Sequence, residues 1–373
     1  MAPLPGLTLV QEKFSWFTIL PGHMKPVINY LLHISQNPSW TDLDYLLVLG
    51  FDEIHLTRRA SFDNKLQRPV GPNKDCQVMV VRGLISKIDR QFPIFSKYDF
   101  TMDVNTLNET ISILYSIKYV VTWVVCDQGP KNRALINSKN LNITPNQPYF
   151  SHPNNSDLKV HFAFDSIHLL KSLASHVRDD YCMLSENIVF TIDDFQHALD
   201  SRGVSEIAIG RKLTPKKIYA TGQTRQNVGY MRTMFSPETA DLIENVDPND
   251  PRLRKIGKFC RDIDSGAEVL TSNDWNFTTN KLHAPLGKHL PEQLEALETF
   301  RTYFETMRFK LKNGNNYRIL PFQHGMLITV SAVISLLNEL KSRYNVFEFL
   351  TERTTQESFT FSENVGFSLP FGV

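Results

Sequence analysis

The chain has 373 residues, of which 42% are hydrophobic and 21% are charged. These values are ordinary for a globular protein that is long enough for two domains or for one large interrupted domain. Its 40 Lys and Arg residues against 39 Asp and Glu residues leave a formal charge of +1, which excludes binding of nucleic acid through bulk basicity. Any nucleic-acid surface must therefore be local.

The four cysteines lie far apart and form no Cys-x-x-Cys pair, which excludes a zinc site of the usual spacing and favours free thiols. The first residues lack the basic region and sustained apolar core of a signal peptide. The apolar run GMLITVSAVISLL, residues 325–337, is too short to cross a bilayer. We therefore expect no membrane partner and a nuclear or cytoplasmic protein that is not secreted.

Strand and helix patterns alternate in the first half of the chain. In order they predict a helix over 25–34, strands over 45–56, 76–85 and 91–100, a helix over 104–119, a strand over 119–129, and a strand from 159 that turns into a helix at Asp165. The uninterrupted run VVTWVVC is typical of a central strand that is covered on both faces. The order predicts an α/β fold.

The pattern changes from about residue 184 to residue 316, where helical periodicity dominates and almost no strand signal is present. This region predicts a helical domain. Within it, residues 211–232 hold several Lys and Arg residues and no acid, which is typical either of a solvated face or of a phosphate-contacting surface. A further amphipathic helix is predicted from residue 331.

Three acids follow apolar strands: Asp52, Asp127 and Asp165. Acids at the C-terminal ends of such strands face the crevice where α/β sheets place their chemistry. Two carboxylates there can hold a pair of Mg²⁺ ions about 3.5–4 Å apart for an in-line phosphoryl displacement, since hard cations prefer oxygen ligands. The alternative is that Asp52 and Asp127 cap strands or turns. For Asp165, which precedes the helical stretch SIHLLKSL, a helix N-cap is favoured over catalysis.

Six motifs in collinear order give the chain a family resemblance. FDEIHL, VVCDQGPKN, FDSIHLLKS, KLTPKKI, NVGYMRTMFS and the long segment from PFQHG to TTQES resemble the P-element transposases and their THAP-domain relatives over residues 43–357. The resemblance implies a ribonuclease H-like mixed sheet with flanking helices, interrupted by a mostly helical, GTP-binding insertion. It implies an N-terminal helical lead-in over 1–42, the first part of the core over 43–183, the insertion over 184–316 and the final part of the core over 317–373.

The same resemblance implies a function by descent: Mg²⁺-dependent DNA cleavage and strand transfer by a DDE-type transposase. Asp52 and Asp127 match the first two catalytic acids and would be the metal ligands. The third position is altered, because Thr360 falls where the family has its catalytic Glu, and Glu357 takes the place of an earlier Asp. Glu357 or Glu363, each about one helical turn away, could supply the missing carboxylate. Loss of strand transfer is the interpretation that we favour.

Matching within the insertion carries five positions of the family's nucleotide site onto this chain: Lys212, Asn227, Val228, Ser236 and Glu268. Asn227 stands where the family has Lys, and Ala267 and Glu268 replace an aromatic–Asp pair that would hold the guanine. Glu keeps an acceptor, but Ala removes the stacking surface. GTP binding is therefore doubtful. Lys212 and its neighbours fit a solvated face and a phosphate contact equally well.

Two further expectations concern metals and partners. His55, His161, His168 and His176 are scattered over separate elements and are predicted to be hydrogen-bonded structural residues rather than metal ligands. The THAP zinc finger and the family's C-terminal domain have no counterpart in this sequence. The predicted partners are transposon-end and target DNA, with a possible homo-oligomer. The alternative function is a non-enzymatic DNA-, nucleotide- or protein-binding protein derived from a transposase.

Overall fold

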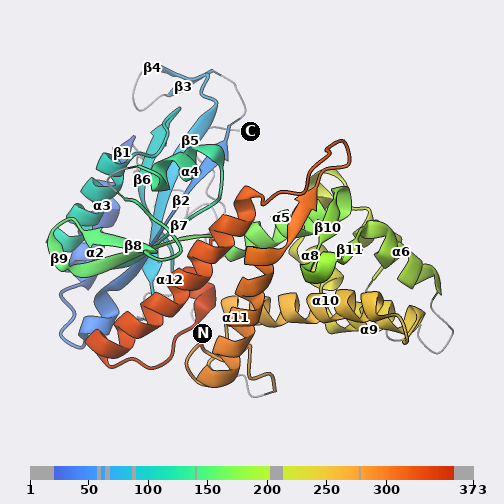
Figure 1. The fold of residues 1–373 in the computed structure, drawn as a ribbon. Coiled ribbons are helices and arrows are strands. Elements are labelled where there is room, and N and C mark those ends of the chain that lie inside the picture. Colours follow the sequence, from blue (N-terminus) through green and yellow to red (C-terminus); the bar gives the residue numbers. More distant parts are fainter. Residues whose placement is uncertain are drawn as a thin grey trace, which may run out of the picture. The chain divides into compact units, whose positions relative to one another are not determined.

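The computed structural model describes the chain over most of its length (Figure 1). The described residues are 21–56, 60–63, 68–85, 90–138, 141–201, 213–276 and 279–356. They divide into two compact units. The first lies within 21–121 and 152–157, and the second lies within 122–151 and 158–356.

Antiparallel strands and two helices form the first unit. Its elements are β1 (Gly22–His23), α2 (Lys25–Ile34), β2 (Leu46–His55), β3 (Ser61–Asp63), β4 (Arg68–Val70), β5 (Asp75–Gly83), β6 (Phe92–Tyr98) and α3 (Val104–Ser116), with a 3₁₀ turn over Asp42–Tyr45. β2 pairs with β5, β5 with β6 and β6 with β1, all antiparallel. The predicted helices and the three predicted strands of this region are confirmed.

Asp52 does not end its strand, contrary to the sequence-based expectation. β2 continues to His55, and Asp52 stands opposite Val78 of β5 within the antiparallel ladder. The burial pattern explains the apparent end, because residues from Leu46 to Phe51 are buried whereas Asp52 is exposed. Only the buried part of the strand stops at Asp52, and the backbone pairing extends three residues further.

The second unit supplies the parallel part of the fold. Its first elements are β7 (Val120–Cys126), which begins at the boundary, α4 (Pro130–Ile136), β8 (Tyr149–His152), β9 (Asn155–Phe164) and α5 (Ser166–Asp179). β7 and β9 are parallel, in register from Trp123 opposite His161 to Cys126 opposite Phe164. The seven-stranded sheet has the order β1-β6-β5-β2-β7-β9-β8. The α/β prediction of a mixed sheet with flanking helices is confirmed.

Helices dominate the region after α5. The elements are β10 (Tyr181–Met183), β11 (Val189–Phe190), α6 (Ile192–Ser201), α7 (Pro215–Ile218), α8 (Val228–Met234), α9 (Pro237–Val246), α10 (Pro251–Leu270), α11 (Leu290–Thr306), β12 (Arg308–Lys310) and α12 (Pro321–Tyr344), with 3₁₀ turns over Ser185–Asn187, Gly222–Gln226 and Thr351–Thr354. α9 packs along α10, and α10 along α11 (Figure 1). The predicted domain boundaries at 43, 184 and 317 stay a prediction.

The expectation of almost no strands in this region was wrong. β10 pairs antiparallel with both β11 and β12, which gives a small three-stranded sheet. Each of these strands has two or three residues, too few to show a period-two pattern. β12 also follows α11 directly, so that its residues read as a continuation of the helix.

Helix α12 is longer than its apolar run suggested. It has 24 residues, and among the described helices it is the one long and apolar enough to cross a membrane by composition. Of its apolar window, 61% is buried inside the structure, and it packs against α5 and α11. The burial is that of a core helix, which agrees with the absence of a membrane partner from the sequence-based prediction.

His161 lies at the centre of the second unit and is fully buried. Its Nδ1 is 3.3 Å from the carbonyl oxygen of Thr122, its Nε2 is 3.0 Å from Ser335 Oγ, and its ring stacks on Trp123. Burial lowers the pKa of His161 to about 4. His161 is therefore a neutral structural histidine, as the sequence predicted.

Acid sensitivity follows from this burial. Between pH 6.5 and 4 the unfolded chain binds a proton at His161 that the folded chain does not bind, so stability should fall as the pH drops through this window. The contribution is up to about 3 kcal/mol. Thermal unfolding from pH 7 to 4 should show a shallower decline for His161→Gln than for the parent chain.

Ser335→Ala is the matched control, because it removes a hydrogen-bond partner and keeps the titrating ring. It should lower the unfolding temperature at every pH and leave the decline itself unchanged. An equally steep decline in His161→Gln would contradict this account.

Candidate functional site

The loop between β7 and α4 holds Asp127 in a fixed orientation. Asp127 Oδ1 accepts hydrogen bonds from the backbone N–H of Gly129 (3.1 Å) and from Asn132 Nδ2 (2.6 Å). Asn132 Nδ2 also lies 3.3 Å from the Asp127 carbonyl oxygen. Pro130 occupies the first turn of α4, where its fixed φ suits a helix start and no N–H is required. Both side-chain bonds use Oδ1, and Oδ2 has no hydrogen-bond donor among the described residues.

Helix α12 secures the same loop from the other side. Gln128 Nε2 donates to the carbonyl oxygen of Pro321 at 2.7 Å. The two segments approach so closely that a Cβ on Gly325 would lie 2.3 Å from Gln128 Nε2, which only glycine avoids. Gln323 Oε1 in turn accepts from the backbone N–H of Leu320 and so closes the first turn of α12. Asp127 therefore lies on a loop with several anchors.

Asp165 lies beside this loop at the neighbouring strand end. Its backbone N–H donates to the carbonyl oxygen of Cys126, which extends the parallel register by one residue and places Asp165 next to Asp127 in the ladder. Its side chain caps α5, because Oδ1 accepts from the backbone N–H of Ile167 at 3.1 Å. The predicted N-cap role is thereby confirmed. His168 Nε2 is 3.8 Å from Asp165 Oδ2, too far for a hydrogen bond.

Asp52 belongs to the first unit, where its carboxylate is exposed. Oδ1 accepts from the backbone N–H of Glu53 at 2.8 Å, and the carbonyl oxygen of Asp52 accepts from Gln77 Nε2 at 2.9 Å. The opening of the carboxylate to solvent explains how an apolar strand tolerates two consecutive acids. A shared metal site with Asp127, which belongs to the second unit, stays a prediction.

The carboxylates fit a hard divalent cation in their chemistry. Asp127 offers one oxygen oriented by amide donors and one that accepts nothing from the described protein. Within the described ranges, no group of three or more His, Cys, Asp or Glu side chains that could hold a metal is assembled. The third acid of the predicted triad cannot contribute to that set, because Glu357, Thr360 and Glu363 lie outside the described residues.

The predicted nucleotide positions occupy helix starts in the second unit. Asn227 caps α8, with its Oδ1 accepting from the backbone N–H of Tyr230 at 3.1 Å, and Val228 is the first residue of that helix. Ser236 caps α9, with its Oγ 3.3 Å from the backbone nitrogen of Thr239. Lys212 lies outside the described residues. The roles of these residues toward a nucleotide stay a prediction.

Glu268 is already engaged by two basic side chains. Arg232 Nη1 donates to Glu268 Oε1 at 2.9 Å, and His283 Nδ1 lies 2.7 Å from Oε2. The hydrogen bond from His283, together with the charge of Arg232, lowers the pKa of the Glu268 carboxyl. Ala267 next to it is buried in α10. Sequence matching placed Glu268 at the guanine position but could not show that Arg232 and His283 compete for its oxygens.

The remaining predicted histidines are also hydrogen-bonded. His55 Nδ1 is 2.6 Å from Asp75 Oδ1, and His176 Nδ1 is 2.7 Å from Asp180 Oδ2 while its ring stacks on Phe322. The prediction of structural histidines is confirmed for these two and for His161. The four cysteines are free and buried, as expected.

Sequence reasoning missed Asn132, Gln128 and Gly325 as supports of the acid. The first two belong to the motif VVCDQGPKN, where an Asn five residues after a strand-end Asp could have signalled a closed loop. Gly325 carries no such signal, because its role depends on the approach of a helix almost two hundred residues away in the sequence.

Comparisons with known proteins give one lineage. No family model matches the chain. The transposable element P transposase of Drosophila melanogaster is 27% identical over 368 residues, which cover 95% of this chain and 46% of that protein. The chain thus spans about half the length of the curated relative that it matches. A chain of the Drosophila P element transposase strand transfer complex matches with a TM-score of 0.83 and 25% identity, over 95% of this chain and 78% of that chain.

The ion pairs of Glu268 give a prediction about stability. The folded-state pKa of Glu268 is lowered, so its contribution is present above the ordinary glutamate pKa and is lost as the pH falls through the lowered value. Glu268→Gln should lower the unfolding temperature at pH 7 by about 2–4 °C, because a charged hydrogen bond contributes on the order of 1 kcal/mol. The difference should narrow below about pH 4.

Glu295→Gln is the control, since Glu295 is an exposed glutamate of α11 for which the described residues provide no cationic partner. Its unfolding temperature should equal that of the parent at both pH values. A Glu268→Gln deficit that persists unchanged at low pH would show that the carboxylate charge is not the cause.

Proposed function

The chain is a relative of the P-element transposases by descent, and from this premise we propose that it is a DNA-binding protein that has lost strand transfer. Asp52 and Asp127 match the family's first two catalytic acids, and both are present. The observation that carries the proposal is Thr360 at the family's third acid. We expect such a protein to act in the nucleus.

Asp52 and Asp127 would hold Mg²⁺, as transposase relatives are generally metal-dependent. When bound, Mg²⁺ activates a nucleophile and stabilises the leaving oxygen of a phosphodiester. On the protein side, Asn132 and Gly129 hold Asp127 Oδ1 and direct the carboxylate, while Oδ2 accepts no hydrogen bond from the described protein. A threonine hydroxyl brings no negative charge, so two acids alone would bind the metal more weakly than three.

The principal alternative is an active transposase in which Glu357 or Glu363 replaces the missing acid. Either residue could approach a metal if the segment after Gln356 were helical, because each is separated from Thr360 by three residues. The substituted side chain would have to reach the same position from a different backbone site. Active sites tolerate displacements of that size poorly, since a misplacement of about 1 Å costs roughly a hundredfold in rate.

For the insertion we propose that guanine recognition in the family's manner is lost. Ala267 offers no aromatic face for the base. The oxygens of Glu268 are engaged by Arg232 and His283, so guanine would have to displace two charged partners to use them. Lys212 keeps its two possible roles, a phosphate contact or a solvated charge.

Strand joining tests the main proposal. The purified chain, incubated with Mg²⁺ or Mn²⁺ and a pre-nicked transposon-end DNA, should join no more DNA than Asp127→Asn, because the third acid is absent. Thr360→Glu should gain joining, and Thr360→Gln, with the same size but no charge, should not. Joining by the parent chain that Asp127→Asn abolishes would refute the proposal and favour the alternative with Glu357 or Glu363.

Titration calorimetry with GTP tests the insertion. The parent chain should show no saturable heat at micromolar concentrations, because the stacking surface is missing and Glu268 is paired. Ala267→Phe restores an aromatic side chain, and any gain of binding in this variant should be lost again in Ala267→Phe combined with Glu268→Gln. Micromolar binding by the parent would mean that the pocket survives.

A further inference from the structure

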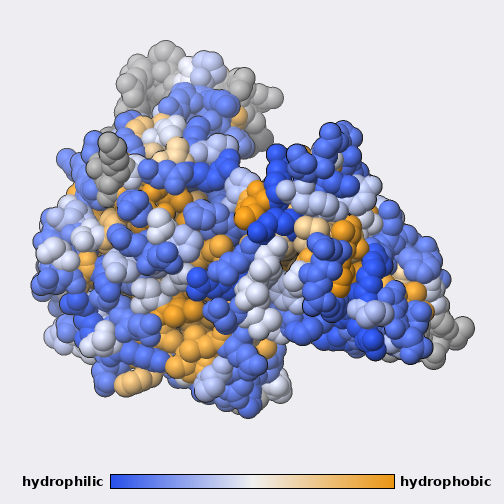
Figure 2. All heavy atoms as spheres, in the orientation of Figure 1, coloured by the Kyte–Doolittle hydropathy of each residue, from blue (hydrophilic) through white to orange (hydrophobic). Residues whose placement is uncertain are grey.

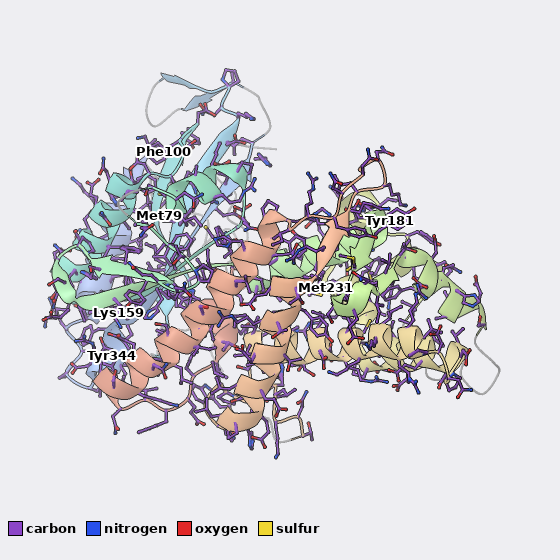
Figure 3. All side chains as sticks on the ribbon, in the orientation of Figure 1. Met79, Phe100, Lys159, Tyr181, Met231 and Tyr344 are labelled. Carbon is purple, nitrogen blue, oxygen red and sulfur yellow. The ribbon has the colours of Figure 1, made fainter. Side chains whose placement is uncertain are left out.

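The three-stranded sheet of the second unit presents one face inward and one outward. Register places Cys182 opposite Phe309, and both are completely buried. The alternate positions, Tyr181 opposite Lys310 and Met183 opposite Arg308, point to the other face because side chains alternate along a strand. Tyr181 is 36% exposed and is labelled in Figure 3. The outer face therefore combines an exposed aromatic ring with basic side chains.

Lys310 is sandwiched with aromatic rings on this face. Its Nζ lies 4.5 Å from the ring centroid of Tyr181 and 5.5 Å from that of Tyr317. Both distances allow a cation–π interaction, which holds the ammonium group against the rings and orients all three side chains. Tyr317 belongs to the segment after β12, which returns to pair Phe309 with Arg318.

The positive charges here are not neutralised by carboxylates. Lys310, Lys312 and Arg318 form no ion pair with an acid in the described part of the chain, and residues 306–338 contain no Asp or Glu. The hairpin after β12 is predominantly hydrophilic in Figure 2. In a chain with a formal charge of +1, an acid-free stretch of this length concentrates positive charge locally.

The two acids beside this face are already engaged. Asp179 accepts both Nη1 and Nη2 of Arg225, and Asp180 Oδ2 lies 2.7 Å from His176 Nδ1. The hydrogen bond from Arg225 and, more weakly, the charge of Lys312 lower the pKa of Asp179. Because each acid has its own partner, the lysines and Arg318 keep a net positive field at the surface.

We propose that this tyrosine–lysine surface, formed by Tyr181, Tyr317, Lys310, Lys312 and Arg318, binds a single strand of nucleic acid. The inference rests on the proposed DNA binding and assigns part of it to a surface. Phosphates contact Lys310, Lys312 and Arg318, and an unstacked base lies on the exposed ring of Tyr181. Proteins that bind single strands combine a basic track with aromatic platforms in this way.

A single strand fits the surface better than a duplex or an acidic protein. In a duplex the bases are stacked on one another and cannot use the face of Tyr181, so only the cations would contribute. An acidic protein likewise needs the cations but not the ring. The exposed Tyr181 next to cations without acids is the feature that distinguishes the strand.

Fluorescence anisotropy with a labelled oligothymidylate of about 20 nucleotides tests the proposal at several salt concentrations. Lys310→Gln combined with Arg318→Gln should weaken binding and reduce the slope of log K against log salt by about 1.4, since each phosphate contact contributes roughly 0.7 for a single strand. Tyr181→Ala should weaken binding about tenfold with little change in slope.

Matched controls separate this surface from general effects. Tyr219 is exposed to 49% but lies near Asp193 and Asp200, so Tyr219→Ala should leave the affinity unchanged. Lys258 is paired with Asp262 on α10, and Lys258→Gln should leave the salt slope unchanged. Circular dichroism and unfolding temperature, measured for every variant, should match the parent, because the altered side chains lie on the surface.

The outcomes distinguish the two proposals. If the parent binds neither single-stranded nor duplex DNA, both the proposed function and this inference are wrong. If it binds DNA and the tyrosine–lysine surface variants bind equally well, only this inference is wrong. Loss of binding in the double Gln variant with no effect of Tyr181→Ala, together with equal competition by polyglutamate, would identify an acidic protein as the partner and would also overturn the inference.

Discussion

Parallel pairing of β7 with β9 is the constraint on which the candidate site depends. The ladder runs from Trp123 to Cys126 on one strand and from His161 to Phe164 on the other, and the bond from the Asp165 N–H to the Cys126 carbonyl extends it to the two acids. In parallel strands of equal register the ends coincide, so Asp127 and Asp165 emerge at the same edge. Their roles then diverge because the chain takes a different course after each strand.

The divergence is decided by the local backbone. After Asp165 the chain enters α5 at once, and the side chain is used to satisfy a helix N–H that would otherwise lack a partner. After Asp127 the loop Gln-Gly-Pro delays the helix, so the carboxylate is held by Asn132 and Gly129 and keeps one oxygen unused by the described protein. Two identical residue types at equivalent strand ends thus serve as a cap and as a candidate ligand.

Electrostatic pairing limits the sites that the second unit offers a ligand. Glu268 is held by Arg232 and His283, Asp179 by Arg225, and Asp180 by His176. Groups that sequence matching would assign to a nucleotide are occupied within the protein, whereas the cations after α11 have no carboxylate partner in the described structure. An anionic ligand gains most where charge is uncompensated, which favours the tyrosine–lysine surface over the guanine position.

The order of residues alone was enough to predict the α/β class, the main strands, the N-cap at Asp165 and the transposase lineage, because each depends on local periodicity or on ordered motifs. It was not enough to predict the three-stranded sheet of β10, β11 and β12, whose strands are too short to show a period. The folded structure was needed to show that Gly325 lets α12 approach Gln128 and that Lys310 lies over Tyr181. Such contacts join residues distant in sequence, and pairwise packing of that kind leaves no periodic trace in the chain.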